Sequence, residues 1–342
     1  MATGLVIATI VIVLIFDYTN GFHDASNIIA TVIASHAMTP IQAVIVVATF
    51  EFLGPVLGGT AVANTIGSFI DVSGLASVAS LVIIMAGVTG AIVWNLATWW
   101  IGIPSSSSHA LVGGLVGPVL ISAGPANVVW GFEELIFHGH ATGVTKVLLA
   151  LILSPIIGFW VGFALQRVTG LMFRGALPSL NRNLRRGQIA TVAWLAFSHG
   201  ANDAQKSMGI ITLVLLTSGH IGSFEVQTWT ILACGGAITL GILTGGWRIV
   251  RTVGFGIYKV RPLHALNTQV TAAGVIFAAA LLGAPVSTTH VVSSSIMGIG
   301  ASERPKAVRW AKAEDIVITW LITLPGAGAV SIMAWLVTQI FV

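Results

Sequence analysis

Charged side chains are scarce in this 342-residue chain. Asp, Glu, Lys and Arg together account for 8% of it, whereas hydrophobic residues account for 56%. Soluble domains carry about 25% charged residues, so this composition excludes an ordinary soluble globular protein. The many long apolar stretches instead predict an all-α polytopic membrane protein embedded in a lipid bilayer.

Cysteine is almost absent, and basic residues are few. The one cysteine, Cys234, lies within an apolar run, which excludes a disulfide framework and most thiolate metal sites. The formal net charge of +4 comes from basic residues in short loops between apolar stretches and does not indicate a nucleic-acid partner. No cleavable signal peptide is indicated either, because the first apolar run lacks a positive n-region and leads directly into a polar motif.

Two polar motifs each occur twice. Asn20-Gly-Phe-His-Asp-Ala-Ser-Asn27 aligns with His199-Gly-Ala-Asn-Asp-Ala-Gln-Lys206, and the two share Gly, Asp and Ala at one offset. Pro104-Ser-Ser-Ser-Ser-His109 aligns with Pro285-Val-Ser-Thr-Thr-His290 at nearly the same offset. Since two different motifs recur in the same order and at nearly the same offset, the sequence predicts an internal duplication.

The first polar motif interrupts an apolar span at about residues 3–35. An ionisable side chain at membrane depth, such as Asp24, costs roughly 2.5–3.5 kcal/mol on insertion scales and usually lines a pathway or a site. The alternative is a hydrogen-bonded contact between helices. Asn20-Gly21 also predicts a broken helix at 19–27, which a membrane protein tolerates only where protein or a polar cavity satisfies the freed backbone groups.

The Pro-hydroxyl-His motifs predict the tips of two re-entrant helical hairpins, at 78–123 and 266–300. Basic residues flank the second hairpin on both sides, so it is expected to enter and leave on the cytoplasmic face; they are Arg248, Arg251, Lys259, Arg261, Arg304, Lys306, Arg309 and Lys312. The sequence therefore predicts two inverted-topology membrane repeats, 1–170 and 188–342, joined by a basic cytoplasmic linker at 171–187. The prediction includes six full spans besides the hairpins, and it places both termini on the outer side of the plasma membrane.

Each hairpin tip offers hydroxyl groups beside the free backbone N–H groups of a helix N-terminus. Such a terminus attracts anions, and Ser and Thr add donors without a fixed charge. Capping of the helix is the competing interpretation, and the histidines could either donate to an anion or take part in capping. The predicted phosphate-binding residues are Ser105, Ser106, Ser107, Ser108, His109, Ser287, Thr288, Thr289 and His290.

Carboxylates beside an anion site imply a coupling cation, which is either a proton on a carboxyl group or a metal ion. Hard cations take oxygen ligands. The predicted cation-coupling residues are Asp24, Asn27, Asn202, Asp203, Lys206 and Glu51, with Asp24 and Asp203 as the candidate metal ligands. Glu51 carries the weakest argument, because it could simply pair with Lys206 or a hydroxyl group. The histidines and glutamates of 124–145 fit a solvated loop better than a metal site.

These motifs, together with Ile92-Val-Trp-Asn-Leu96 and Phe197-Ser-His-Gly-Ala-Asn-Asp203, resemble those of the inorganic phosphate transporter (PiT) family and, within it, the bacterial low-affinity phosphate permeases. The resemblance covers both repeats and implies symport of phosphate with a cation across the plasma membrane. In sodium-coupled members the duplicated Asp and Asn residues are associated with sodium and the hairpin hydroxyls with phosphate. Lys206 departs from that pattern at the position that matches Asn27.

The lysine favours proton coupling over sodium, since an ammonium group is a poor neighbour for Na⁺. The resemblance also implies that phosphate travels as a neutral complex with a divalent metal, and it suggests a homodimer. The long inter-repeat domain of many relatives is replaced here by the basic linker.

Three other functions stay open. An intramembrane hydrolase would use Ser108, His109 and Asp24, but adjacent Ser and His rarely face each other, and no Gly-x-Ser-x-Gly elbow surrounds either tip. A passive anion channel would favour basic pore rings. A sulfate symporter is the nearest rival; only phosphate can be protonated near neutral pH. We therefore expect a transporter without a cofactor rather than an enzyme.

Overall fold

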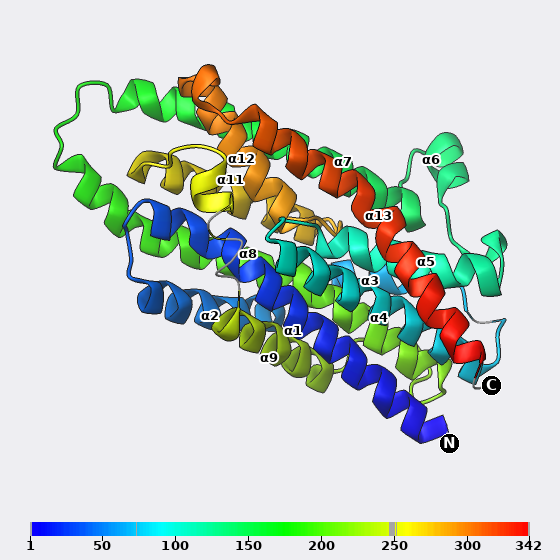
Figure 1. Ribbon diagram of the computed structural model, residues 1–342. Coiled ribbons are helices and arrows are strands. Elements are labelled where there is room, and N and C mark those ends of the chain that lie inside the picture. Colours follow the sequence, from blue (N-terminus) through cyan, green and yellow to red (C-terminus); the bar gives the residue numbers. More distant parts are fainter. Residues whose placement is uncertain (1, 73, 246–249, 251, 341–342) are drawn as a thin grey trace.

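The computed structural model describes residues 2–72, 74–245, 250 and 252–340. Their regular structure is helical, apart from one isolated bridge between Ile70 and Val128. The two termini lie at one end of the bundle, and the turn that joins α7 (Gly143–Met172) to α8 (Leu180–Thr217) lies at the other (Figure 1). The predicted all-α class is confirmed.

The helices fall into two successive sets. The first set contains α1 (Ala2–Ala34), α2 (Pro40–Leu57), α3 (Ala61–Gly67), α4 (Ser77–Ile101), α5 (Ser107–Ser122), α6 (Phe132–His138) and α7. The second contains α8, α9 (Thr228–Thr244), α11 (Pro262–Leu281), α12 (Thr288–Glu303) and α13 (Trp310–Gln339). The described residues also include two short 3₁₀ helices, η1 (Pro125–Asn127) and η3 (Pro305–Ala307), and one short π-helix, η2 (Thr252–Gly256).

Six of the described helices are long and apolar enough to cross a membrane, namely α1, α2, α4, α7, α11 and α13. The number equals the predicted number of full spans, but the membership differs, because the prediction assigns full spans to α8 and α9 and hairpin arms to α4 and α11. The α8 helix has 38 residues and includes both basic and polar stretches, while α9 has only 17.

The predicted break at 19–27 is wrong. Helix α1 continues without interruption through Asn20-Gly21 to Ala34, and α8 likewise continues through its own motif. Gly21 permits close packing instead, because a Cβ atom there would lie 2.1 Å from the carbonyl oxygen of Ile238 on α9. A glycine costs a helix only about 1 kcal/mol, and an unbroken helix satisfies its own backbone groups within a membrane.

Two helical hairpins occur where the sequence predicts them. Helices α4 and α5 pack against each other and are joined by residues 102–106, while α11 and α12 are joined by residues 282–287. The first arm, α4, has 25 residues, which is roughly 37 Å of helix and exceeds the hydrocarbon thickness of about 30 Å. The re-entrant path of the hairpins stays a prediction.

Helices α1 and α8, which carry the two Gly-x-x-Asp motifs, run antiparallel. Along α1, Asn20, Asp24 and Ser35 meet Asp203, His199 and Gln188 of α8 in reverse order. The sets also exchange partners: α2 packs on α8 and α9 on α1, while α7 packs on α12 and α13 on α5. This reciprocal packing places both Gly-x-x-Asp motifs where α1 crosses α8.

The linker is shorter than predicted. Residues 173–179 join α7 to α8, because the basic residues Arg182, Arg185 and Arg186 belong to the first turns of α8 rather than to a loop. Of the basic residues before the second hairpin, Arg248 and Arg251 lie outside the described residues. The segment 124–145 contains the exposed α6, on which the solvated side chains of His138 and Glu134 pair at 3.2 Å.

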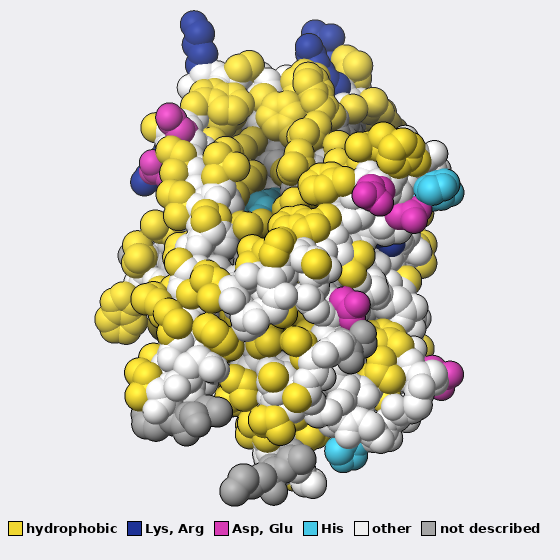
Figure 2. All heavy atoms as spheres, turned by 90° about the vertical axis from the view of Figure 1, so that its right-hand side faces the viewer, with side chains coloured by type: hydrophobic (Ala, Val, Ile, Leu, Met, Phe, Trp, Pro, Cys, Tyr) yellow, Lys and Arg dark blue, Asp and Glu magenta, His cyan; other side chains and the backbone are white. Residues whose placement is uncertain are grey.

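The surface of the bundle is largely apolar. In the face drawn in Figure 2, hydrophobic side chains cover most of the height of the molecule, and most of the visible Lys and Arg side chains gather at one end. Trp100, Trp160 and Leu321 are among the large apolar side chains that are more than half exposed. Such a surface suits contact with lipid tails.

Candidate functional site

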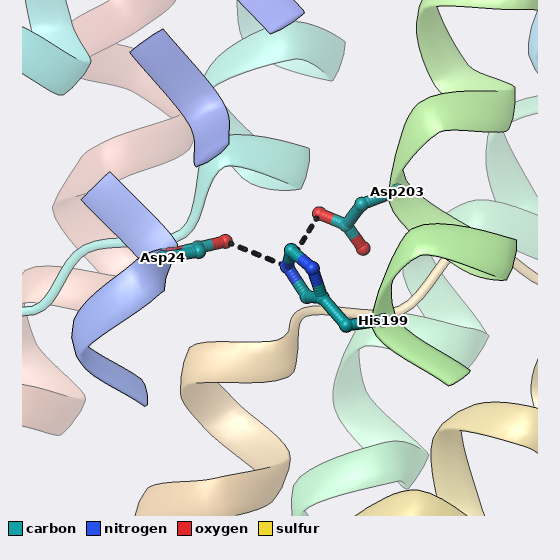
Figure 3. A group of neighbouring side chains, drawn as sticks. All are labelled: Asp24, His199 and Asp203. Atoms are coloured by element: carbon teal, nitrogen blue, oxygen red, sulfur yellow. Dashed lines mark ion pairs between the residues drawn. The ribbon is translucent and has the colours of Figure 1, made fainter. Parts of the chain in front are cut away.

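Asp24, His199 and Asp203 form the centre of the site, where α1 crosses α8. The imidazole of His199 lies between the two carboxylates (Figure 3), with its Nε2 atom 3.7 Å from Asp24 Oδ2 and 3.7 Å from Asp203 Oδ2. All three side chains are buried, and one ligand atom from each lies within 4.8 Å of the others. The group could therefore hold a proton or a metal ion between two carboxylates.

Glu51 orients this imidazole. Its Oε1 atom lies 2.6 Å from His199 Nδ1, and both side chains are completely buried. The alternative that Glu51 pairs with Lys206 is therefore wrong. Because Nδ1 is engaged by Glu51, the other ring nitrogen faces the two aspartates, and it has no hydrogen-bond partner among the described residues.

Asp24 is held by four side chains from three elements. His23 Nδ1 lies 2.8 Å from Asp24 Oδ1, and Asn27 Nδ2 donates to the same oxygen at 2.9 Å. Thr289 on α12 donates to it at 3.1 Å, and Ser107 on α5 donates to Oδ2 at 3.4 Å. Both hairpin tips therefore reach the first aspartate.

Lys206 joins the second aspartate to the hairpins. The completely buried ammonium group lies 2.8 Å from Asp203 Oδ2, and it donates to Ser108 Oγ at 2.6 Å and to the carbonyl oxygen of Val286 at 3.2 Å. An isolated charge would be costly at this depth, so these contacts fix the position of the lysine between α8, α5 and the loop before α12.

The hydroxyl groups at the tips divide into two kinds. Ser106 and Ser287 are N-caps, since each accepts a hydrogen bond from the backbone N–H three residues later, at 3.1 and 3.4 Å. Ser107, Ser108 and Thr289 lie in the first helical turn and contact the charged residues described above. The capping interpretation and the site interpretation therefore both apply, to different members of each motif.

The remaining predicted residues lie at the edge of this centre. Ser105 bonds to Thr98 at 2.7 Å, and the side chain of Asn202 bonds to the backbone of Ala284 and Val286 at 3.1 and 3.2 Å. Asn202 thus holds the loop of the second hairpin through both the nitrogen and the oxygen of its side-chain amide. Thr288 Oγ1 has no hydrogen-bond partner among the described residues.

His109 and His290 contact each other instead of the carboxylates. Their ring centroids lie 4.8 Å apart, and the indole of Trp320 stacks on His290 at 3.8 Å. Both rings border a cavity of about 390 Å³ whose walls are mainly apolar. Their predicted contact with an anion stays a prediction.

Several buried polar atoms around the centre lack a hydrogen-bond partner among the described residues. They are Asn20 Oδ1, Asn27 Oδ1, Glu51 Oε2, His199 Nε2 and Asp203 Oδ1. Buried polar atoms are almost always satisfied, so a cluster of exceptions calls for an explanation such as a small polar ligand or an ion. His23 and His199 were not predicted as site residues, although His23 adjoins Asp24 and His199 lies one turn before Asp203 on the same helix.

The chain matches the phosphate transporter family twice, over residues 20–181 and 174–331. Two matches in succession confirm the predicted duplication, and they support transport rather than catalysis.

Curated relatives match along nearly the whole chain. The probable low-affinity inorganic phosphate transporter of Bacillus subtilis (strain 168) is 43% identical, covering 97% of this chain and 98% of the relative. The protein of the same description from Rhizobium meliloti (strain 1021) is 40% identical, covering 98% and 97%. The solved structure named "The sodium-dependent phosphate transporter" shares the fold, with a TM-score of 0.87 over 99% of this chain and 100% of that chain at 22% identity. The chain belongs to the phosphate transporter family.

Proposed function

We propose that the protein imports inorganic phosphate across the cell membrane together with protons, by alternating access. The observation that carries this proposal is the position of Lys206, whose ammonium group contacts both Asp203 and the hydroxyl group of Ser108. A phosphate oxygen that takes the place of one of these contacts would meet a fixed positive charge, a hydroxyl donor and the N-terminus of α5.

The arrangement also favours the proton over sodium. The second aspartate already has an ammonium partner, which leaves little place for Na⁺ beside it. Asp24 is the better sodium candidate, since Asn27 and Thr289 could supply further oxygen atoms. A sodium-coupled carrier is therefore the second candidate, and the name of the structural neighbour points the same way.

A divalent metal that travels with phosphate is compatible with the same centre. Two carboxylates and an imidazole suit metals such as Mn²⁺ or Zn²⁺, and His199 Nε2 faces both aspartates. The metal would be cargo in this case, carried as a neutral metal–phosphate complex. Its positive charge would replace the proton in offsetting the two aspartates.

Transport would follow from the antiparallel repeats. A site at the crossing of two inverted repeats can open to either side when one repeat rocks against the other. An anion beside two carboxylates binds well only when their charge is neutralised, so phosphate and the proton should bind together. By the positive-inside tendency, the short linker at 173–179 and the first turns of α8 would face the cytoplasm, with both termini outside.

Uptake of radiolabelled phosphate into proteoliposomes tests this function. A proton gradient and a sodium gradient are imposed separately, and sulfate is offered as the competing anion. We expect accumulation with the proton gradient alone and no inhibition by sulfate. Accumulation only with sodium would replace the proton by Na⁺ at Asp24, and no phosphate uptake under either gradient would overturn the proposal.

A further inference from the structure

Asp17 is a second buried carboxyl group on α1, two turns before Asp24 and on the same face of the helix. Its side chain is completely buried, and neither carboxylate oxygen has a hydrogen-bond partner that meets normal geometry among the described residues. The central site does not use it.

Among the described residues, the groups with the largest influence on Asp17 are acids and weak donors. The polar groups that act on it are the Ser207 hydroxyl of α8 and the Cys234 thiol of α9, together with the more distant carboxylates of Asp203 and Glu51. Ser207 Oγ also lacks a hydrogen-bond partner among the described residues. Neither α4 nor α9, which both pack on α1, contains a Lys, Arg or His residue.

A buried carboxylate without a positive partner is strongly disfavoured at membrane depth, and binding a proton removes the charge. The arrangement thus favours the neutral carboxyl form of Asp17 in this conformation. The nearest base in sequence on α8, Lys206, is already engaged with Asp203 and Ser108.

Two polar residues of α1 and α8 lie between Asp17 and the central site. Asn20, one turn further along α1, donates to Asp203 Oδ2 at 3.2 Å. Its side-chain oxygen Oδ1 has no hydrogen-bond partner among the described residues. On α8, Ser207 follows Asp203 by one turn. Asp17 is therefore close enough for its charge to act on Asp203 but is separate from the groups that would contact phosphate.

We propose that Asp17 is a second proton-carrying group of the transport cycle, and that its negative charge weakens phosphate binding at the hairpin tips. This inference rests on the proposed function. The carboxyl group takes up a proton from water on the side where phosphate enters and releases it to water on the other side, returning as the carboxylate. Asp17 thus adds one proton to those that cross with each cycle, and no other covalent bond changes.

The test separates coupling from binding by two measurements on the same proteoliposomes. Phosphate accumulation driven by a proton gradient reports coupling, and exchange of labelled for unlabelled phosphate at equal pH reports binding and reorientation. Asp17→Asn has nearly the same size as the native side chain but cannot carry a proton. We expect it to accumulate less phosphate than the wild type at the same proton gradient, because one of two coupled protons is lost, while it still exchanges phosphate.

Two further variants complete the design. Asp17→Glu keeps a carboxyl group and should retain accumulation, and Asp315→Asn, which removes an exposed carboxyl group from α13, should behave as the wild type. The pH dependence of exchange should also become flatter in Asp17→Asn than in the wild type.

Accumulation by Asp17→Asn at the wild-type rate would overturn the inference. Loss of both activities in a correctly folded Asp17→Asn protein would also overturn it, because Asp17 would then belong to the phosphate site itself. Failure of the wild type to exchange or accumulate phosphate would refute the proposed function instead.

Discussion

At the scale of the residue, buried charge determines what the centre of this protein can bind. Asp24, Glu51 and Asp203 are three buried acids, and His199 and Lys206 are buried bases that contact them. Phosphate brings further negative charge. Its entry therefore requires a cation, whether this is a proton, sodium or a metal.

Lys206→Met tests the strength of the Asp203–Lys206 pair. The change leaves Asp203 as an uncompensated buried charge, which typically costs about 3–5 kcal/mol of stability. We expect a marked loss of thermal stability in detergent, and most of it should be restored in the double variant Lys206→Met with Asp203→Asn, whose second change removes the remaining charge.

Lys312→Met serves as the matched control. Lys312 pairs with Asp315 at 3.0 Å, but both side chains are exposed, so its loss should cost less than about 1 kcal/mol. Equal losses in the two single variants would show that burial of the Asp203–Lys206 pair does not matter.

At the scale of the element, glycines set how closely the repeats approach each other. Gly21 of α1 packs on the backbone of α9, and Gly200 of α8 packs in the same way on α2, where a Cβ atom would lie 2.2 Å from the carbonyl oxygen of Glu51. The equivalent glycines of the two repeats thus perform equivalent roles, and Glu51 is held at the site by this contact.

Gly21→Ala should push α1 away from α9. The added methyl group overlaps backbone atoms that cannot move aside as a side chain would, and overpacking of this kind costs about 1–3 kcal/mol. The expected result is a lower melting temperature and reduced phosphate uptake. Gly236→Ala is the control, because a Cβ atom at Gly236 of α9 has nothing within 4 Å; a similar loss there would contradict the packing argument.

The role of a glycine within a helix could not be predicted from the sequence. The duplication, the two hairpins and the aspartates of the site follow from repeated motifs and from polar residues in apolar stretches. A glycine within a helix, however, is compatible both with a break and with close packing. The choice depends on a partner such as Ile238, which is far away in the chain and unknown before folding.

His199 was missed for the same physical reason. Its role depends on Glu51, which lies on α2 and meets it at 2.6 Å only in the folded chain. Asp17 could have been found from the sequence, because it is a carboxyl group in an apolar run. It was not predicted as a site residue, since the more polar motif at 20–27 follows it directly.

At the scale of the whole molecule, the two successive sets of helices pack on each other reciprocally, with α1 and α8 antiparallel at the centre. The linker at 173–179 lies at the end opposite the termini (Figure 1). This arrangement fits the predicted topology, in which the linker is cytoplasmic and both termini are outside.

Single-cysteine labelling in cells tests that topology. The native Cys234 is completely buried and should not react with a membrane-impermeant maleimide. Ser179→Cys, in the linker, should react only after the cytoplasmic face is made accessible, and Ser223→Cys, at the other end of α8, should react in intact cells. Labelling of both positions from the same side would contradict the inverted arrangement.

Proton movement during phosphate uptake tests the central claim most directly. Proteoliposomes that contain the wild-type protein and an internal pH-sensitive dye receive external phosphate without a sodium gradient, beside liposomes that contain Asp24→Asn. We expect phosphate entry to acidify the lumen with the wild type and neither phosphate entry nor acidification with Asp24→Asn. Phosphate entry without acidification, or undiminished transport by Asp24→Asn, would contradict proton symport at the crossing of α1 and α8.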